Sequence, residues 1–284
     1  MRRPLAPGQP IAGWRLERRL GEGSHGQVFL ARPASARVDE AAVALKLVTL
    51  DAGDADARTR FLRQAESVQR LVHPDIVRLL GAGVEGDLGW LAMQLAPGVE
   101  LTRYTGPARL LPEALVLRVG ERIARALAHA HALGFVHRDL KPANVRVHWA
   151  SDSVMLVDLG LARGADAEAT ATGVVPGTPA YMAPEQLAGA LPDARTDLYA
   201  LGVTLYQLLS GRLPHEAATM GEWLRRAAQE PAPRLAELRP DLPAALDALL
   251  ARLLERERAR RAADAAAVAD ALHAIAAAMG AGAP

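Results

Sequence analysis

The chain has 284 residues, half of them hydrophobic, which is enough for one large domain or two modest ones with a sizeable apolar core. Its 33 basic and 32 acidic residues nearly cancel, so no nucleic-acid or membrane-surface partner is expected from charge. The absence of cysteine excludes disulfides, thiol catalysis and cysteine-ligated zinc, and it is compatible with a reducing cytosol.

The N-terminus lacks the pattern of a secretory signal. Arg2 and Arg3 supply positive charge, but Pro7 and Pro10 interrupt the segment where an apolar run would have to follow. No apolar stretch reaches the roughly 18 residues that span a bilayer, because the most apolar region, residues 262–279, contains two aspartates and a histidine. We therefore expect a cytoplasmic chain without a membrane segment, and a packed amphipathic helix over residues 262–279.

The first ninety or so residues have the pattern of short strands around one helix. Apolar residues at helical spacing extend over residues 57–72, and Pro74 stops that helix. The other segments show period-2 alternation or continuous apolar runs, which are typical of strands. The predicted strands are residues 14–20, 27–31, 42–48, 77–84 and 89–95.

Beyond Pro97 and Gly98, helical spacing dominates. Leu115, Val119 and Ile123, for example, recur on one face of a single predicted helix. The predicted helices are residues 112–133, 196–210, 220–229, 242–254 and 262–279.

A small strand-rich part followed by a larger helical part predicts an α+β protein of two lobes, with a cleft between them. The helical part would form the larger lobe, and a short hinge would join the two. The expected division is an N-terminal extension at 1–13, an N-lobe at about 14–95, a hinge at about 94–98, a C-lobe at about 99–277 and a flexible tail or linker stump at 278–284.

Residues 21–26 have the sequence GEGSHG, a glycine pattern that is a weak signal by itself. Glycine permits the close backbone approach that a phosphate needs, but ordinary turns use glycine as well. The context narrows the choice, because the apolar run Val28-Phe29-Leu30 follows the glycines. Strand–loop–strand differs from the strand–loop–helix of dinucleotide-binding enzymes, so the pattern predicts a flap over phosphates.

Lys46 ends a short apolar run, Val43-Ala44-Leu45, in a predicted strand. Alone, it would be an ordinary strand lysine that faces solvent. Because it follows the last glycine of the loop by 20 residues, an ammonium group that reaches phosphate oxygens is the better interpretation.

The most specific cluster consists of three motifs: HRDLKPAN at residues 137–144, DLG at 158–160 and GTPAYMAPE at 177–185. The first motif places a carboxylate, a lysine and an asparagine on a loop interrupted by proline, and the second adds Asp158 beside a glycine. Phosphoryl transfer needs such groups, because metal ligands help to shield the phosphate charge and a carboxylate accepts the proton of the attacking hydroxyl.

With these motifs in this order, the chain resembles the eukaryotic-type (Hanks-type) serine/threonine protein kinases, and its composition suits their bacterial members. The resemblance extends over about residues 14–277, nearly the whole chain. It implies a two-lobed kinase fold, transfer of the ATP γ-phosphate to protein substrates that include the chain itself, and Mg²⁺ as the metal, with Mn²⁺ as the alternative.

The resemblance also implies roles around the nucleotide. Lys46 would hold the α- and β-phosphates, and Met93 would be the gatekeeper behind adenine. The Gln94 carbonyl and the Ala96 amide would pair with adenine at the hinge. The residues implied to bind ATP are Leu20, Gly21, Glu22, Gly23, Ser24, His25, Gly26, Val28, Ala44, Lys46, Met93, Gln94, Ala96, Glu100 and Arg146.

In the catalytic loop, Asp139 would be the base, and Asn144 and Asp158 would hold the metal. Lys141 would lie near the transferred phosphate with Thr178 supporting it, and this pair favours serine and threonine over tyrosine as acceptors. The catalytic residues implied in this way are Asp139, Lys141, Lys46 and Thr178.

Other matching positions are expected to be structural. Glu185 should pair with Arg261 and brace the activation segment, and Asp197 should bind the backbone of the catalytic loop. An apolar spine that links the lobes would consist of His137, Leu159, Val68 and Leu79.

Gln64 is the main departure from the family pattern. It stands nine residues before His73, where the family has the glutamate that pairs with Lys46, and Glu66 lies about 200° around the helix. A glutamine accepts a hydrogen bond but supplies no charge. We therefore expect Gln64 to be a regulatory position, with Lys46 facing a neutral partner and basal activity low or dependent on a partner.

Two milder departures concern apolar positions. Leu159 replaces the usual phenylalanine, a conservative change. Arg146 stands at the floor position under adenine, where its aliphatic stem can pack against a ring while the guanidinium reaches water.

Thr170 and Thr172 lie between the second and third motifs, in the segment that kinases often phosphorylate. They can also be two polar residues of an alanine-rich loop. Arg138 precedes the base, and such an arginine can pair with a phosphothreonine and order the loop. We expect autophosphorylation at Thr172, Thr170 or both.

Two rival functions remain to be weighed. A pseudokinase that acts as a signalling scaffold is supported by Gln64 and Arg146. Such a scaffold has no chemical reason to keep the four groups that phosphoryl transfer uses, which are Lys46, Asp139, Asn144 and Asp158. A small-molecule phosphotransferase of related fold would lack the third motif, which docks polypeptides in protein kinases.

Overall fold

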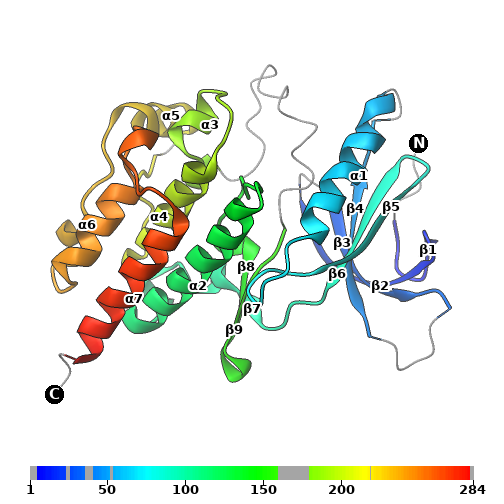
Figure 1. The fold of residues 1–284 in the computed structure, drawn as a ribbon, viewed down its shortest axis with the longest axis horizontal. Coiled ribbons are helices and arrows are strands. Elements are labelled where there is room, and N and C mark those ends of the chain that lie inside the picture. The colour runs from blue at the N-terminus through cyan, green and yellow to red at the C-terminus, as the bar shows by residue number, and fades with distance from the viewer. Residues whose placement is uncertain are drawn as a thin grey trace. The chain divides into compact units, whose positions relative to one another are not determined.

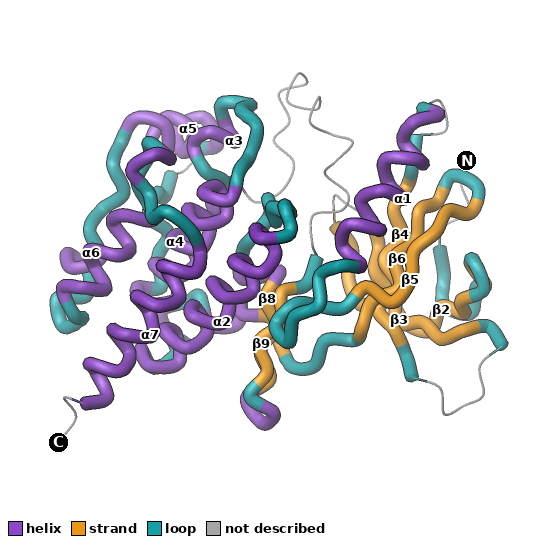
Figure 2. Tube along the Cα trace, viewed as in Figure 1, coloured by secondary structure: helices purple, strands orange, loops and turns teal. Residues whose placement is uncertain are grey.

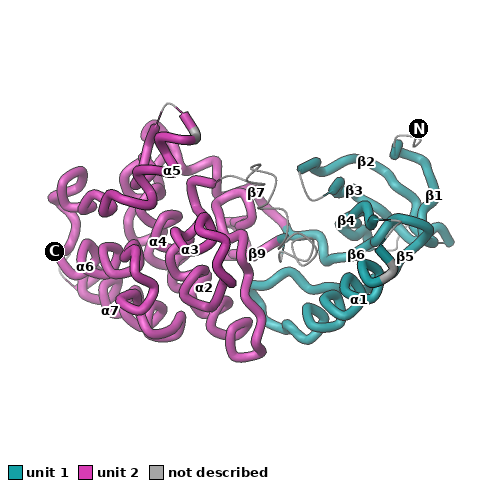
Figure 3. The backbone as a smooth tube through the Cα atoms, turned by 90° about the horizontal axis from the view of Figure 1, so that it is seen from above, with its two compact units in different colours: residues 1–96, 158–177 teal, residues 97–157, 178–284 magenta. Residues whose placement is uncertain are grey.

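The structure, a computed structural model, describes residues 5–23, 26–35, 41–51, 54–158, 179–217 and 219–281. The chain forms two compact units, of which the first combines residues 1–96 with 158–177 and the second combines 97–157 with 178–284 (Figure 3). Strands predominate in the first unit and helices in the second (Figure 2), as the sequence predicts.

The first unit is built on a six-stranded sheet in the order β1-β2-β3-β4-β6-β5, in which every neighbouring pair is antiparallel. Five of these strands match the predicted ones, and the two-residue β1 is too short to leave a periodic signal in the sequence. The strands are β1 (Pro10–Ile11), β2 (Trp14–Gly23), β3 (Gly26–Pro33), β4 (Val43–Thr49), β5 (Leu79–Glu85) and β6 (Leu88–Gln94) (Figure 1).

The two faces of this sheet carry different residues because side chains alternate along a strand. One face forms an apolar core around Phe29, Leu45 and Ala92, with Trp90 packed against it. On β4, Lys46 lies between the core residues Leu45 and Leu47, so it belongs to the opposite face.

Helix α1 (Ala55–Gln69) packs on β5 and β6 of the same unit (Figure 1). The Asp54 side chain begins it by accepting hydrogen bonds from the amides of Asp56 and Ala57 in the first turn. The predicted extension to residue 72 is wrong. The Arg70 amide bonds the carbonyls of Ser67 and Val68, a tight turn that closes the helix before Pro74 is reached.

The second unit is a helical body in which α2 packs against α4 and α7. Glycines allow the close approach: a Cβ on Gly120 of α2 would lie 2.7 Å from a Leu205 methyl, and one on Gly202 of α4 would lie 2.8 Å from Leu253 Cβ. The helices are α2 (Glu113–Ala132), α3 (Pro184–Leu187), α4 (Ala194–Ser210), α5 (Met220–Gln229), α6 (Ala244–Leu253) and α7 (Ala265–Ala281).

The start of α7 also differs from the prediction. The Asp264 side chain accepts the Ala267 amide at 2.8 Å, so the helix begins after this residue instead of at residue 262. Its buried residues Val268, Leu272 and Ile275 lie on one face, which confirms a packed amphipathic helix. Within the described part of the chain, we find no helix long and apolar enough to cross a membrane.

A small antiparallel sheet in the second unit was not predicted, because its strands have two to four residues each. Gly98 precedes it with a φ of +80°, and a Cβ there would lie 2.0 Å from the Val147 carbonyl oxygen, so glycine is required. The strands are β7 (Val99–Glu100), β8 (Val145–His148) and β9 (Ser153–Leu156), in the order β7-β8-β9.

Candidate active site

The glycine loop joins β2 to β3, which confirms the predicted strand–loop–strand arrangement. Gly23 pairs with Gly26, where φ is +115° and a Cβ would lie 2.1 Å from the Leu47 carbonyl oxygen. A Cβ on Gly21 or Gly23 would meet nothing within 4 Å. Gly26 is therefore required by the packing of β3 on β4, whereas the other two glycines leave open space that a ligand can use.

Polar side chains brace the ends of this hairpin. Arg19 donates to the Glu22 carboxylate at 2.5 Å, and Gln27 donates to the same carboxylate at 3.0 Å. Leu20 is 37% exposed. Ser24 and His25 lie outside the described residues.

Lys46 is almost fully buried, at 4% exposure, and makes an ion pair with Asp158, whose side chain is 34% exposed. Both residues belong to the first unit. The pairing of Val28 with Lys46, and of Ala44 with Met93, places these residues on the same face of the sheet. This face thus presents an ammonium group beside small and apolar side chains.

Asp158 has a φ of +59°, in the left-handed region that a non-glycine residue seldom occupies. Such a conformation costs about 1 to 3 kcal/mol and persists where the surrounding structure enforces it, often at functional sites. Lys46, which the sequence predicts to face Gln64, forms its ion pair with this carboxylate.

Gln64 lies at the edge of the buried face of α1, and Glu66 is exposed. The buried face includes Phe61, Ala65 and Val68, and Gln64 follows Phe61 by one turn. Glu66, which the sequence places about 200° around the helix from Gln64, is therefore directed away from the buried face.

The end of β6 leads out of the first unit. Met93 is buried, at 8% exposure, and the Gln94 amide donates to the Arg78 carbonyl at 2.9 Å. That amide is therefore occupied within the unit. Ala96 is buried and is the last residue of this part of the unit.

Arg146 does not send its guanidinium only to water, as the sequence led us to expect. It donates to the carbonyls of Pro97 and Gly98, all within the second unit. Glu100 pairs with Arg146 across β7 and β8 and accepts the Thr102 hydroxyl at 3.1 Å. Arg146 therefore stabilises the backbone that follows the first unit, a contact that spacing alone could not reveal.

The loop at residues 137–144 brings three predicted site residues together. Lys141 Nζ donates to the Asp139 carboxylate at 2.9 Å, and Asn144 Nδ2 donates to the same carboxylate at 3.0 Å and to the Asp139 carbonyl at 2.7 Å. The Asp139 and Lys141 side chains are 10% and 15% exposed. The result is a carboxylate held in one orientation by a cation and an amide.

Asp197 of α4 fixes the backbone of this loop, as predicted. Its carboxylate accepts the amides of His137 and Arg138, each at 2.8 Å, and it is only 1% exposed. These bonds hold Arg138 at a φ of +67° immediately before Asp139. His131 of α2 also binds this carboxylate, at 2.8 Å, a contact that the sequence analysis missed.

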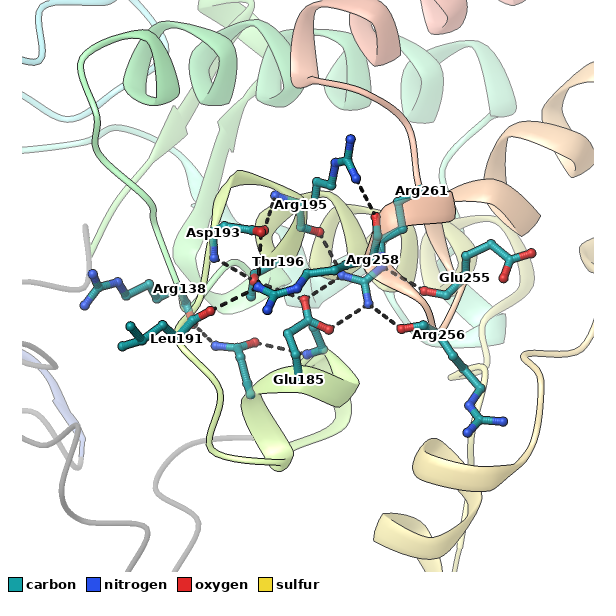
Figure 4. Close-up of polar contacts among 12 residues, drawn as sticks. Arg138, Glu185, Leu191, Asp193, Arg195, Thr196, Glu255, Arg256, Arg258 and Arg261 are labelled. Carbon is teal, nitrogen blue, oxygen red and sulfur yellow. Dashed lines mark hydrogen bonds and ion pairs between the residues drawn. The ribbon is translucent and has the colours of Figure 1, made fainter.

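Arg261 is the centre of a second polar cluster in the same unit (Figure 4). Its guanidinium donates twice to the Glu185 carboxylate, at 2.7 Å each, which confirms the predicted pair. Its remaining donor bonds go to the carbonyls of Arg195, Glu255 and Arg256. All five N–H groups of the guanidinium are thus used.

Burial raises the pKa of Glu185, but the hydrogen bonds and charge of Arg261 outweigh it and hold the pKa below its usual value of 4.5. Thr196 adds a hydrogen bond to the same carboxylate at 3.1 Å. On the other side, the Tyr199 ring lies 4.9 Å from the Arg261 guanidinium carbon. Burial raises the pKa of Tyr199 to about 12.

The cluster is connected to the catalytic loop through α3. Gln186, next to Glu185 in the sequence, donates to the Arg138 carbonyl at 3.1 Å. Thr196 and Asp197 are neighbours on α4, one bound to Glu185 and the other to the loop. The pair at Glu185 therefore sets the position of the loop that carries Asp139.

Several predicted residues lie outside the described residues. They comprise the two regulatory threonines, the residue expected to support Lys141 and one member of the apolar spine: Thr170, Thr172, Thr178 and Leu159.

Each unit supplies one oxygen donor of the kind that magnesium takes. The Asn144 nitrogen is bound to Asp139, so its oxygen is the atom that can coordinate a metal, and Asp158 provides a carboxylate. Among the residues that the structure describes, no group of three or more histidine, aspartate or glutamate side chains forms a metal cage. Magnesium suits such a donor set, because it is usually held by one or two carboxylates with waters and substrate phosphates.

The family model described as "Protein kinase domain" matches residues 14–273 of this chain. The model thus spans both units.

Curated relatives are bacterial serine/threonine-protein kinases. PknJ of Mycobacterium tuberculosis is 39% identical over 92% of this chain and 45% of its own length. The kinase pkn3 of Myxococcus xanthus is 36% identical over 92% of this chain and 50% of its own length. The DNA damage-responsive kinase RqkA of Deinococcus radiodurans is 38% identical over 94% of this chain and 40% of its own length. The chain spans half or less of the length of these relatives.

The fold is similar to that of the PknI kinase domain of Mycobacterium tuberculosis. The crystal structure of that domain gives a TM-score of 0.75 at 32% identity, and the match covers 96% of this chain and 100% of that domain. The predicted two-lobed α+β class is confirmed by this similarity.

Proposed function

Since this chain belongs to the protein kinase family, in its bacterial serine/threonine branch, we propose that it transfers the γ-phosphate of ATP to serine and threonine hydroxyls of protein substrates. Such a reaction needs ATP, so we also propose a cytoplasmic site of action. The residues at about 94–98 would serve as the hinge between an N-lobe and a C-lobe.

The arrangement of Asp139, Lys141 and Asn144 carries this proposal. The Asp139 carboxylate, held at 2.9 Å by Lys141 and 3.0 Å by Asn144, has one oxygen engaged by both donors. A carboxylate oriented in this way can accept the proton of a substrate hydroxyl. Lys141 would then neutralise charge on the transferred phosphoryl group, since it already lies beside the base.

The first unit would bind the nucleotide. Gly21 and Gly23 leave space in which backbone can approach phosphates, and Lys46 supplies a positive charge on the same sheet. Asp158 and Asn144 would hold Mg²⁺, which when bound shields the phosphate charge. Because Lys46 pairs with Asp158, the carboxylate and the ammonium are preorganised near each other before nucleotide enters.

Autophosphorylation forms part of the proposal. Arg138 occupies the left-handed conformation beside the base, and its backbone is fixed on both sides, by Asp197 through the amide and by Gln186 through the carbonyl. A guanidinium on so rigid a backbone suits recognition of a phosphothreonine. We propose Thr172 and Thr170 as the modified residues.

The test is phosphate transfer by purified protein. The chain is incubated with labelled ATP, Mg²⁺ or Mn²⁺ and a basic protein substrate, beside an Asp139→Asn control. Label that appears with the wild type and falls at least a hundredfold with the control is the expected result, and phosphoamino-acid analysis should show serine or threonine. Nucleotide binding without transfer would instead favour the pseudokinase alternative.

Autophosphorylation is tested separately by the intact mass after incubation with Mg·ATP. A gain of one or two phosphates that disappears when Thr170 and Thr172 are both replaced by alanine is expected. A protein that transfers label to substrate without gaining mass would exclude this part of the proposal alone.

A further inference from the structure

The position of α1 matters because this helix covers the sheet face that carries Lys46. Lys46 pairs with Leu91 on β6, and two positions along the ladder Val48 pairs with Gly89. Partners in an antiparallel ladder share a face, so Gly89 lies on the face of Lys46, about 7 Å along the strands. A contact at Gly89 is therefore close to the row that contains the lysine.

The Phe61 ring of α1 fills the space beside Gly89. A Cβ on Gly89 would lie 2.8, 2.9 and 3.0 Å from three carbons of this ring, closer than real Cβ atoms approach. Phe61 is only 4% exposed and is flanked on the helix by Ala57 and Ala65, also buried. The absence of a side chain at Gly89 thus leaves space that the Phe61 ring occupies. We call this contact the Phe61–Gly89 anchor.

Polar contacts support the same end of the helix. Arg58 donates to the carbonyl of Gly86, in the turn between β5 and β6, at 2.7 Å. Asp54 caps the helix and pairs with Arg60. The first two turns of α1 are therefore tied to the sheet through packing and a backbone carbonyl.

The charges on α1 differ from those of a helix that is held to the sheet by an ion pair between a helix glutamate and the strand lysine. Glu66 is exposed, and Gln64 carries no charge. Lys46 forms its ion pair with Asp158. A Gln64 amide could add a hydrogen bond to Lys46, but the electrostatic attraction between helix and lysine that a carboxylate would supply is missing.

We propose that the Phe61–Gly89 anchor positions α1 over the Lys46 row and takes the place of a lysine–glutamate ion pair in holding this part of the active site. Phe61 and Gly89 are positioning residues in this proposal, because they act through the placement of α1 and Lys46. The proposal rests on the phosphotransferase function for its kinetic readout, but the placement of α1 is measurable without it.

The test introduces a methyl group into the anchor with Gly89→Ala, which forces the Phe61 ring to move. The matched control is Gly83→Ala. A Cβ on Gly83 would lie 2.7 Å from the Trp90 ring, an equally close contact, but on the opposite face of the sheet, where Trp90 joins the apolar core. Both variants are thus overpacked against one aromatic ring, and they differ in whether that ring belongs to α1.

We expect Gly89→Ala to lower kcat about tenfold while KM for ATP changes less than about threefold, because misplacement of a catalytic group affects the transition state more than binding. Gly83→Ala should keep kcat within about twofold of the wild type at a similar loss in Tm. Equal kcat values for the two variants, or a wild-type kcat in Gly89→Ala, would overturn the proposal.

Amide hydrogen exchange gives an independent readout. Exchange over residues 57–69 should become faster in Gly89→Ala and stay unchanged in Gly83→Ala, even if the wild type transfers no phosphate at all. A second change, Phe61→Leu in the Gly89→Ala background, shortens the side chain and should slow this exchange again. Identical exchange of α1 in wild type and Gly89→Ala would refute the anchor.

Discussion

Two cation–carboxylate pairs, one from each unit, differ in burial and in the number of hydrogen bonds. Arg261 and Glu185, in the helical unit, have side chains that are 0% and 9% exposed, and the arginine donates all five of its N–H groups (Figure 4). The Lys46 side chain, in the strand-rich unit, is 5% exposed, but the side chain of its partner Asp158 is 34% exposed.

This difference separates a permanent pair from an exchangeable one. A buried bidentate pair with every donor used cannot open without leaving a charge in a nonpolar environment. A pair whose carboxylate reaches solvent can separate at small cost in free energy. The carboxylate can then bind water or a metal ion, and the ammonium group can bind a phosphate. The first arrangement suits the bracing of a loop, and the second suits a site that binds and releases nucleotide.

Arg261→Met should break the permanent pair with the largest effect. It leaves the Glu185 carboxylate buried with the hydroxyl of Thr196, so we expect a loss of about 3 to 5 kcal/mol in the free energy of unfolding. Urea denaturation of the wild type and the variant measures this loss in the free energy of unfolding. The double variant with Glu185→Gln should regain part of the loss, and a single-variant loss below about 1 kcal/mol would contradict the assigned role.

Lys46→Met should have little effect on stability and a large effect on phosphate transfer. The carboxylate left behind is one-third exposed and can be hydrated, so the free energy of unfolding should change by less than about 1 kcal/mol. Phosphate transfer should fall at least about a hundredfold, because an electrostatic contact to the phosphates is lost. A protein with near-normal transfer would remove Lys46 from the proposed machinery.

Acid should weaken the permanent pair in a defined range. The Arg261 interaction holds the pKa of folded Glu185 below its usual value of 4.5, so the unfolded chain binds the proton more readily. The stabilisation is therefore complete above about pH 5 and is lost as the pH falls through the lower, folded pKa. The Tm difference between wild type and Glu185→Gln should shrink between about pH 6 and pH 3, and a constant difference would argue against this origin.

Gln64→Glu should have the smallest effect on activity of the substitutions considered, and it adds a carboxylate where the other variants remove a charged group. A carboxylate at the edge of the buried face of α1 can compete with Asp158 for Lys46. We expect an increase in kcat of roughly two- to fivefold, the range that a partly exposed pair of up to about 1 kcal/mol can supply. A variant with no increase would show that basal activity does not depend on this position.

The sequence alone predicted most of the fold and the identity of the polar groups. Five strands of the large sheet and the main helices were identified from apolar periodicity, since each is long enough to show it. The pairs Glu185–Arg261 and Asp197 with the catalytic loop were predicted from motif resemblance and are present. The two- to four-residue strands β1, β7, β8 and β9 were missed, because so few residues cannot establish a period.

Contacts between distant residues were decided by the tertiary structure. His131 on Asp197, Arg146 on the carbonyls of Pro97 and Gly98, and Phe61 in the space beside Gly89 each depend on where two elements meet. Apolar periodicity does not predict such roles for glycine or arginine. Gly89 acts by leaving space for a neighbouring ring, and Arg146 acts through a long side chain that contacts a distant backbone.

The amino-acid sequence by itself therefore determined which chemical groups this chain has and the order in which they occur, because motif spacing and periodicity are local properties. That Lys46 forms an ion pair with Asp158 was decided only in three dimensions. The strength of an ion pair depends on burial and on competing partners, and both are set by the packing of segments more than 100 residues apart, as the separation of Lys46 and Asp158 by 112 positions illustrates.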